Sequence, residues 1–148
     1  FDAGMLIGAI LADQTRSVED AMSLYGRKLG TAFQLADDAL DYSSNNKDLG
    51  KNIGDDLAEG KPTLPLIHAL RKGSPGEQVA IRNAIEEGGL HQLDTIIAAI
   101  ESSDALGYTM QQARKSANEA VAALDKVPDS PFKASLIELA HFAANRSY

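Results

Sequence analysis

The 148-residue sequence contains no cysteine and no tryptophan, and aromatic residues make up only 5% of it. The lack of cysteine excludes a disulfide framework and a thiolate metal site. Lysine and arginine total 14 against 21 acidic residues, which leaves a net charge of −7. Because nucleic-acid binding is dominated by neutralisation of phosphates, this charge argues against a nucleic-acid partner. A small anionic substrate is still possible, since a few lysines can gather at one site.

Long apolar runs are also missing. No segment reaches the roughly 20 apolar residues that a membrane-spanning helix needs, and the N-terminus lacks the basic region of a signal peptide. We therefore expect a cytoplasmic protein without stable membrane insertion. The composition, 44% hydrophobic and 24% charged, is that of a globular protein. The length suits one ordinary domain, and we expect no internal boundary within residues 1–148.

Apolar residues recur at helical spacing through most of the chain, and no alternating run is long enough for a strand. The sequence therefore predicts an all-α fold of about seven helices. Residues 1–12 are apolar almost all round and are predicted to form a buried helix. The second helix is predicted to begin at the capping-box-like Ser17–Asp20 and to end at Tyr42. The remaining helices are expected at residues 64–72, 74–87, 90–102, 106–124 and 132–146.

The second helix carries four polar side chains on one face. They are Gln34, Asp37, Asp38 and Asp41, spaced three, four and seven residues apart. Such a face can simply be solvated, but apolar neighbours on nearly every other side favour buried carboxylates that need a partner. Mg²⁺ is usually held by one or two carboxylates plus substrate phosphates, so we expect the carboxylates to converge on a common point. The glycine-punctuated loop that follows contains Lys51 and Lys61, whose ammonium groups can act as point charges on phosphate oxygens.

The run from Gly30 to Tyr42, GTAFQLADDALDY, resembles the second aspartate-rich motif of the trans-polyprenyl diphosphate synthases. Gly50-Lys51 and residues 56–66, DLAEGKPTLPL, are similar to the next two signatures of that family, in the same order. The resemblance continues to the C-terminus and is nearest to the octaprenyl branch. It implies that the chain is the C-terminal part of an isoprenoid-synthase helical bundle, because the family's first aspartate-rich motif is missing. The acids of residues 55–59 lack the paired arginines that follow that first motif, so we interpret them as loop or supporting groups.

The resemblance implies a prenyltransferase activity. In this family Mg²⁺ ions bridge aspartate clusters to an allylic diphosphate, such as farnesyl diphosphate, which leaves to give an allylic cation. The double bond of isopentenyl diphosphate attacks the cation, a proton is lost, and the chain grows by five carbons. The implied product is a long-chain polyprenyl diphosphate, octaprenyl in this branch, which supplies quinone side chains.

The same resemblance assigns roles to seven residues. They are the metal ligands Asp37, Asp38 and Asp41, the diphosphate-binding Lys51 and Lys61, and Phe33 and Gln34 beside the cationic carbon. Asp37 would be the principal ligand, with Asp38 and Asp41 binding the same ion directly or through water. Asp37, Lys51 and Lys61 would be the catalytic residues, since the ion and the lysines stabilise the departing diphosphate. A homodimer is also expected, because the apolar first helix has to be covered.

Two other functions are weighed against this one. A terpene cyclase or head-to-head condensing enzyme of the same fold lacks the series of motifs found here. A non-catalytic helical partner subunit of a heteromeric prenyltransferase usually loses its aspartates, and all three are present in this chain. The prenyltransferase hypothesis is therefore preferred.

The chain alone is expected to fold as a helical unit and yet to fail to elongate prenyl diphosphates. One acidic cluster with two lysines lacks the further ions that the missing motif would bind. Incubation with Mg²⁺, farnesyl diphosphate and labelled isopentenyl diphosphate should give no extended product. Measurable elongation would show that the missing aspartates are dispensable.

Overall fold

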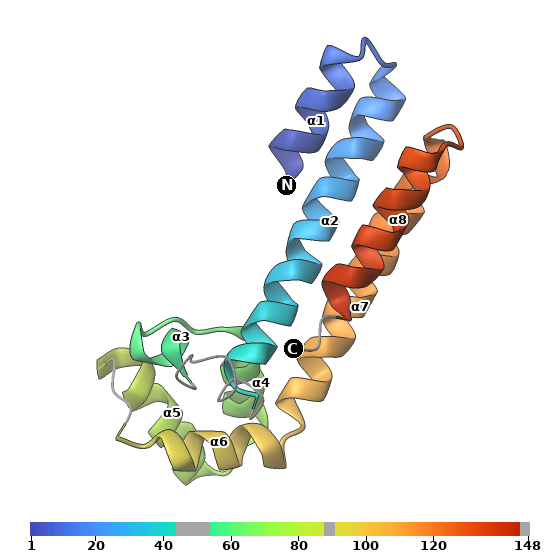
Figure 1. The fold of residues 1–148 in the computed structure, drawn as a ribbon. Helices are drawn as coiled ribbons and strands as arrows, with labels where there is room; N and C mark the ends of the chain where they lie inside the picture. Colours follow the sequence, from blue (N-terminus) through green and yellow to red (C-terminus); the bar gives the residue numbers. More distant parts are fainter. Residues whose placement is uncertain (44–53, 88–90, 146–148) are drawn as a thin grey trace. The chain divides into compact units, whose positions relative to one another are not determined.

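The structure is a computed structural model that describes residues 1–43, 54–87 and 91–145, and most of these are helical (Figure 1). The helices are α1 (Asp2–Leu11), α2 (Arg16–Asp41), α3 (Asp55–Ala58), α4 (Leu64–Lys72), α5 (Pro75–Glu87), α6 (Leu93–Ser102), α7 (Ala105–Ala123) and α8 (Pro131–Ala144), with a 3-10 turn at Leu124–Lys126. No strand occurs among the described residues. The all-α prediction is confirmed, and the short α3 is the helix that the sequence pattern did not predict.

The described backbone divides into two compact units. Unit 1 contains residues 1–36 and the described residues from 112 onward, and unit 2 contains the described residues of 37–111. The long helices α2 and α7 each contribute residues to both units. The expectation of one domain without an internal boundary stays a prediction. In the described part of the chain, no helix is long and apolar enough to cross a membrane.

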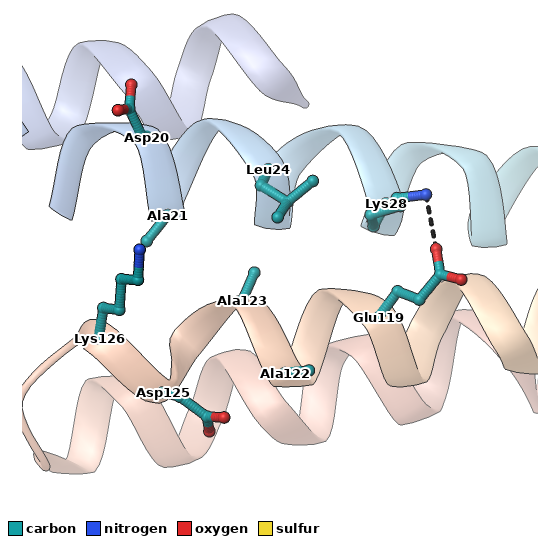
Figure 2. A pocket seen from close by; sticks show the side chains of 9 residues that line it. All are labelled: Asp20, Ala21, Leu24, Lys28, Glu119, Ala122, Ala123, Asp125 and Lys126. Carbon is teal, nitrogen blue, oxygen red and sulfur yellow. Dashed lines mark ion pairs between the residues drawn. The ribbon is translucent and has the colours of Figure 1, made fainter. Parts of the chain in front are cut away.

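Unit 1 consists of α1, most of α2, the second half of α7 and α8. Its buried core contains Tyr25, Leu29, Ala120, Ala123, Leu124, Ala140 and Ala143. The Tyr25 hydroxyl donates a hydrogen bond to the carbonyl oxygen of Leu136 at 2.8 Å, which ties α2 to α8. An ion pair of 2.5 Å between Lys28 and Glu119 joins α2 to α7, and the ammonium group lowers the pKa of Glu119 (Figure 2).

Beside this ion pair lies a pocket of about 570 Å³ between α2 and α7 (Figure 2). Apolar side chains of both helices line it, among them Leu24 and Ala123, and charged residues line the rest. Leu24 is 37% exposed.

Two predictions about the first helices are wrong. Residue Ala9 is buried in α1, whereas Ile7, Ile10 and Leu11 are exposed, Leu11 to 82%. The apolar sequence correctly predicts a helix, but α1 packs on α2 along one side only, so most of its circumference is uncovered (Figure 1). The second error concerns Ser17, which lies inside the first turn of α2 rather than before it.

Unit 2 is built from the last turn of α2, helices α3 to α6 and the beginning of α7. Helices α4, α5 and α6 pack on one another. Their core contains Tyr42, Leu57, Leu66, Ala69, Ile81, Ala84, Ile96, Ala99, Ile100 and Ala105. A capping box begins α5, where the Ser74 N–H donates to the Glu77 carboxylate at 2.6 Å. This local chemistry explains why α5 begins at Pro75, next to the predicted start.

The chain before α1 reaches α2 very closely at Gly26. A Cβ atom at this position would lie 2.8 Å from the Asp2 Cα and 2.8 Å from the Phe1 carbonyl oxygen. The Ser23 hydroxyl donates to the Asp2 carboxylate at 2.6 Å and holds the same crossing. Only glycine fits here without movement of the backbone.

We predict that Gly26→Ala lowers the free energy of unfolding by about 1–3 kcal/mol, because backbone atoms must shift to admit the methyl group. Gly8→Ala is the matched control, since a Cβ there meets nothing within 4 Å. Its loss of backbone freedom in the unfolded chain should raise stability by roughly 0.5–1 kcal/mol. Urea unfolding followed by circular dichroism measures both, and equal responses of the two variants would contradict the close approach.

Candidate functional site

The three aspartates of the motif lie on the last turns of α2 and belong to unit 2. Their surroundings differ. Asp37 is exposed, Asp41 is half-buried, and Asp38 is only 7% exposed. Each of the three takes part in at least one polar or electrostatic interaction. The helix therefore presents Asp37 to solvent, whereas Asp38 is drawn toward the core of the unit.

Asp41 connects the motif to the start of α3. Its carboxylate oxygen Oδ2 accepts a hydrogen bond from the backbone N–H of Asp56 at 3.3 Å. Its carbonyl oxygen accepts another from the N–H of Gly54 at 3.2 Å. The first N–H groups of a helix have no partner within the helix, so the Asp41 carboxylate satisfies one that α3 leaves open.

Tyr42 is buried next to the aspartates, and it is 4% exposed. Burial raises the pKa of its hydroxyl well above the ordinary value, and the nearby Thr63 hydroxyl lowers it in part. Three carboxylates raise the same pKa further, those of Asp41, Asp56 and Asp38. The charges of these three carboxylates therefore favour the neutral form of the Tyr42 hydroxyl. Neither hydroxyl, of Tyr42 or of Thr63, makes a well-formed hydrogen bond to a described residue.

Lys61 lies on the exposed segment after α3, and its ammonium group contacts acidic neighbours. It forms ion pairs with Glu59 at 2.5 Å and with Asp56 at 3.5 Å. The Lys61 pKa is raised, chiefly by its hydrogen bond and charge interaction with Glu59. Since the side chain is 56% exposed, water screens these contacts. The lysine is thus accessible to an anion that can replace Glu59.

The other predicted residues are placed differently. Lys51 lies outside the described residues. Phe33 belongs to unit 1, and its ring lies 5.6 Å from the Phe1 ring, centroid to centroid, at a tilt of 44°. Gln34 is exposed and lines a pocket of about 410 Å³ together with Phe1 and Arg27. The roles assigned to these three residues beside a substrate stay predictions.

The expected convergence of the three carboxylates on a common point stays a prediction. Among the described residues, no group of three or more histidine, aspartate or glutamate side chains is arranged to hold a metal ion. Helical spacing places Asp37, Asp38 and Asp41 on neighbouring positions of one helix, but solvent, core and α3 draw the three side chains into different environments. Their assignment as metal ligands stays a prediction.

Sequence reasoning missed the roles of Tyr42, Asp56 and Thr63 around the end of α2. The signal for Asp56 was present, because an acidic pair directly after Gly54 is typical of a helix start. No pattern in the sequence shows that the partner of this helix start is Asp41.

Comparison with known proteins agrees with the motif series. Residues 1–103 match the polyprenyl synthetase family. The chain belongs to the polyprenyl synthetase family. Over 149 residues it is 48% identical to the octaprenyl diphosphate synthase of Haemophilus influenzae, a match that covers 100% of this chain and 45% of that protein. The octaprenyl diphosphate synthase of Escherichia coli is also 48% identical, with 99% of this chain and 46% of the relative covered.

Solved structures of polyprenyl synthetases share the fold. The polyprenyl synthase of Caulobacter crescentus, complexed with calcium and isoprenyl diphosphate, is 40% identical with a TM-score of 0.87. The match covers 99% of this chain and 45% of that one. A decaprenyl diphosphate synthase of Rhodobacter capsulatus is 33% identical, also with a TM-score of 0.87, over 97% and 45% of the two chains. The chain thus spans about half the length of the polyprenyl synthetases that it matches.

The two buried tyrosines form a matched pair for testing the site. The Tyr25 hydroxyl donates to the Leu136 carbonyl, and burial raises its pKa to about 12. Tyr25→Phe should therefore lower the free energy of unfolding by about 1 kcal/mol, because a buried acceptor loses its donor. Tyr42→Phe should leave stability unchanged or raise it by up to about 1 kcal/mol, because an unpaired buried hydroxyl is removed. Urea unfolding measures the free energy of unfolding of both variants. If Tyr42→Phe loses more of it than Tyr25→Phe does, the Tyr42 hydroxyl is hydrogen-bonded.

Proposed function

We propose that this chain is part of a prenyltransferase that adds isopentenyl diphosphate units to an allylic diphosphate such as farnesyl diphosphate. The proposed product is a long-chain polyprenyl diphosphate, octaprenyl, for quinone side chains. Membership of the polyprenyl synthetase family and the 48% identity to octaprenyl diphosphate synthases support this function. The main structural support for this function comes from the end of α2. There the motif FQLADDALDY presents Asp37 to solvent next to the buried Asp38.

The proposed cofactor is Mg²⁺. The ion takes oxygen ligands and is commonly held by one or two carboxylates, water and substrate phosphates, so three convergent carboxylates are not required. Asp37, the exposed member of the motif, fits the part of the principal protein ligand, and Asp38 stands next to it. A bound ion would supply positive charge beside the leaving diphosphate. The Caulobacter crescentus polyprenyl synthase complexed with calcium and isoprenyl diphosphate supports a divalent cation in this role.

Lys61 is proposed to bind the diphosphate, together with Lys51. In the structure the ammonium group of Lys61 is paired with Asp56 inside α3 and with Glu59, which directly follows that helix. Exposed ion pairs contribute little free energy, so exchange of Glu59 for a diphosphate oxygen is inexpensive. The lysine then stabilises negative charge that grows as the carbon–oxygen bond breaks, which is the step where fixed positive charge helps most.

The homodimer remains part of the proposal. The exposed Ile7, Ile10 and Leu11 give α1 an apolar surface that a second copy of the chain can cover. Location in the cytoplasm is proposed on the sequence alone. A non-catalytic partner subunit is less well supported, because the chain keeps all three aspartates and both lysines of the motif series.

In the full-length protein, Asp37→Ala should lower kcat by about 10²–10³-fold, because it removes electrostatic stabilisation of the transition state. The KM for isopentenyl diphosphate should change much less, since the ion holds the allylic diphosphate. Asp94→Ala is a suitable control, because Asp94 is an exposed acid in the first turn of α6. Steady-state kinetics at saturating Mg²⁺ measure both variants. A kcat near that of the wild type in Asp37→Ala would refute the proposed role.

A further inference from the structure

The last turn of α2 is bonded to the short helix α3 through one residue. The Asp41 carboxylate accepts from the N–H of Asp56 at 3.3 Å, and the Asp41 carbonyl accepts from the N–H of Gly54 at 3.2 Å. Gly54 precedes α3 with a φ of 85°, a conformation that glycine adopts easily. No side chain of Gly54 can cap the helix, so the cap comes from Asp41 instead.

Helix α3 depends on such support. It has only four residues, Asp55–Ala58. A helix of one turn fixes several backbone dihedrals for very few hydrogen bonds and is unstable alone. Leu57 enters the core of unit 2 and is fully buried, which anchors one side of the turn. The bond from Asp41 fixes its beginning.

The position of Lys61 follows from the geometry of α3. The N–H of Lys61 donates to the Asp56 carbonyl at 2.9 Å, and the N–H of Gly60 donates to the Leu57 carbonyl at 2.9 Å. The ammonium group of Lys61 also contacts the Asp56 carboxylate at 3.5 Å. Asp56 therefore donates a hydrogen bond to Asp41 of α2 through its N–H group, and its carbonyl and carboxylate oxygens both contact Lys61.

We propose that Asp41 is a positioning residue, which caps α3 and thereby places Lys61 for the substrate diphosphate, rather than a metal ligand as its place in the motif suggested. The inference rests on the proposed function, because it assigns Lys61 to the diphosphate. It separates the three aspartates of the motif by role. Asp37 serves the ion, and Asp41 serves the lysine.

The two roles of Asp41 respond differently to a neutral amide. Asparagine accepts hydrogen bonds at a helix start about as well as aspartate does, whereas alanine cannot. A magnesium ligand, in contrast, contributes through its negative charge. Asp41→Asn therefore keeps the cap and removes the charge, while Asp41→Ala removes both. Asp55→Asn is the matched control, because it removes one charge from the exposed Asp55 in the same turn without touching the Asp41 bonds.

The experiment measures kcat, the KM for farnesyl diphosphate and the Mg²⁺ concentration for half-maximal activity in the full-length protein. Asp41→Ala should raise the KM for farnesyl diphosphate by about tenfold, the effect of losing one helix cap. In Asp41→Asn, the KM for farnesyl diphosphate should stay close to the values of the wild type and of Asp55→Asn. The Mg²⁺ concentration for half-maximal activity should not change. Hydrogen exchange of the amides of residues 56–61 should be faster in Asp41→Ala only.

An Asp41→Asn variant as impaired as Asp41→Ala, with a Mg²⁺ requirement raised about tenfold or more, would overturn the inference and identify a metal ligand. If Asp41→Ala does not fold, Asp41→Asn still separates the two roles. A Mg²⁺ requirement equal to that of the wild type indicates the cap of α3, and a raised requirement indicates a metal ligand. Failure of the proposed function is a separate result, because then the wild-type protein would not elongate farnesyl diphosphate at all.

Discussion

Acidic side chains crowd the end of α2, and the surrounding structure has to offset their mutual repulsion. Like charges three or four residues apart on a helix cost about 0.2–0.5 kcal/mol per pair. The fold separates them by environment, since Asp37 faces solvent, Asp38 is buried, and Asp41 accepts a backbone N–H of α3. Through this hydrogen bond, one of the mutually repelling carboxylates, that of Asp41, stabilises the start of α3. Helix α3, and through Leu57 one part of the unit 2 core, depends on it.

The buried Tyr42 links this polar cluster to the core beneath it. Its side chain belongs to the same buried cluster as Leu57 and Leu66, while the carboxylates of the motif raise the pKa of its hydroxyl. A neutral phenol is well suited to this place, because a buried anion beside three carboxylates would be strongly disfavoured. The end of α2 is thus held by two kinds of contact. Tyr42 belongs to the apolar cluster of unit 2, and Asp41 accepts a hydrogen bond from the start of α3. The exposed Asp37 can therefore change its interaction partner without disturbing this apolar packing.

The sequence predicts the helices well wherever the deciding chemistry is local. Pro65 and the pair Ser74 and Glu77 fix the starts of α4 and α5 through the backbone groups of neighbouring residues. It does not predict α3, because one helical turn has no period and its cap comes from Asp41, far back in the sequence. It also misplaces the burial of α1, since an apolar pattern shows which surface favours contact and not whether a neighbour is there. For the site, spacing predicts which face carries the aspartates but not how three environments pull them apart.

The acidic partners of Lys61 are compatible with the diphosphate-binding role that we propose for this lysine. An unpaired lysine among carboxylates is not expected, and Glu59 and Asp56 neutralise it at 2.5 and 3.5 Å. Because all three side chains are at least partly exposed, the pairs are screened and easily broken. A diphosphate group by itself carries more negative charge than the single carboxylate of Glu59. Under the proposed function, the same ammonium group would therefore interact more strongly with a diphosphate than with Glu59, provided that α3 holds it in place.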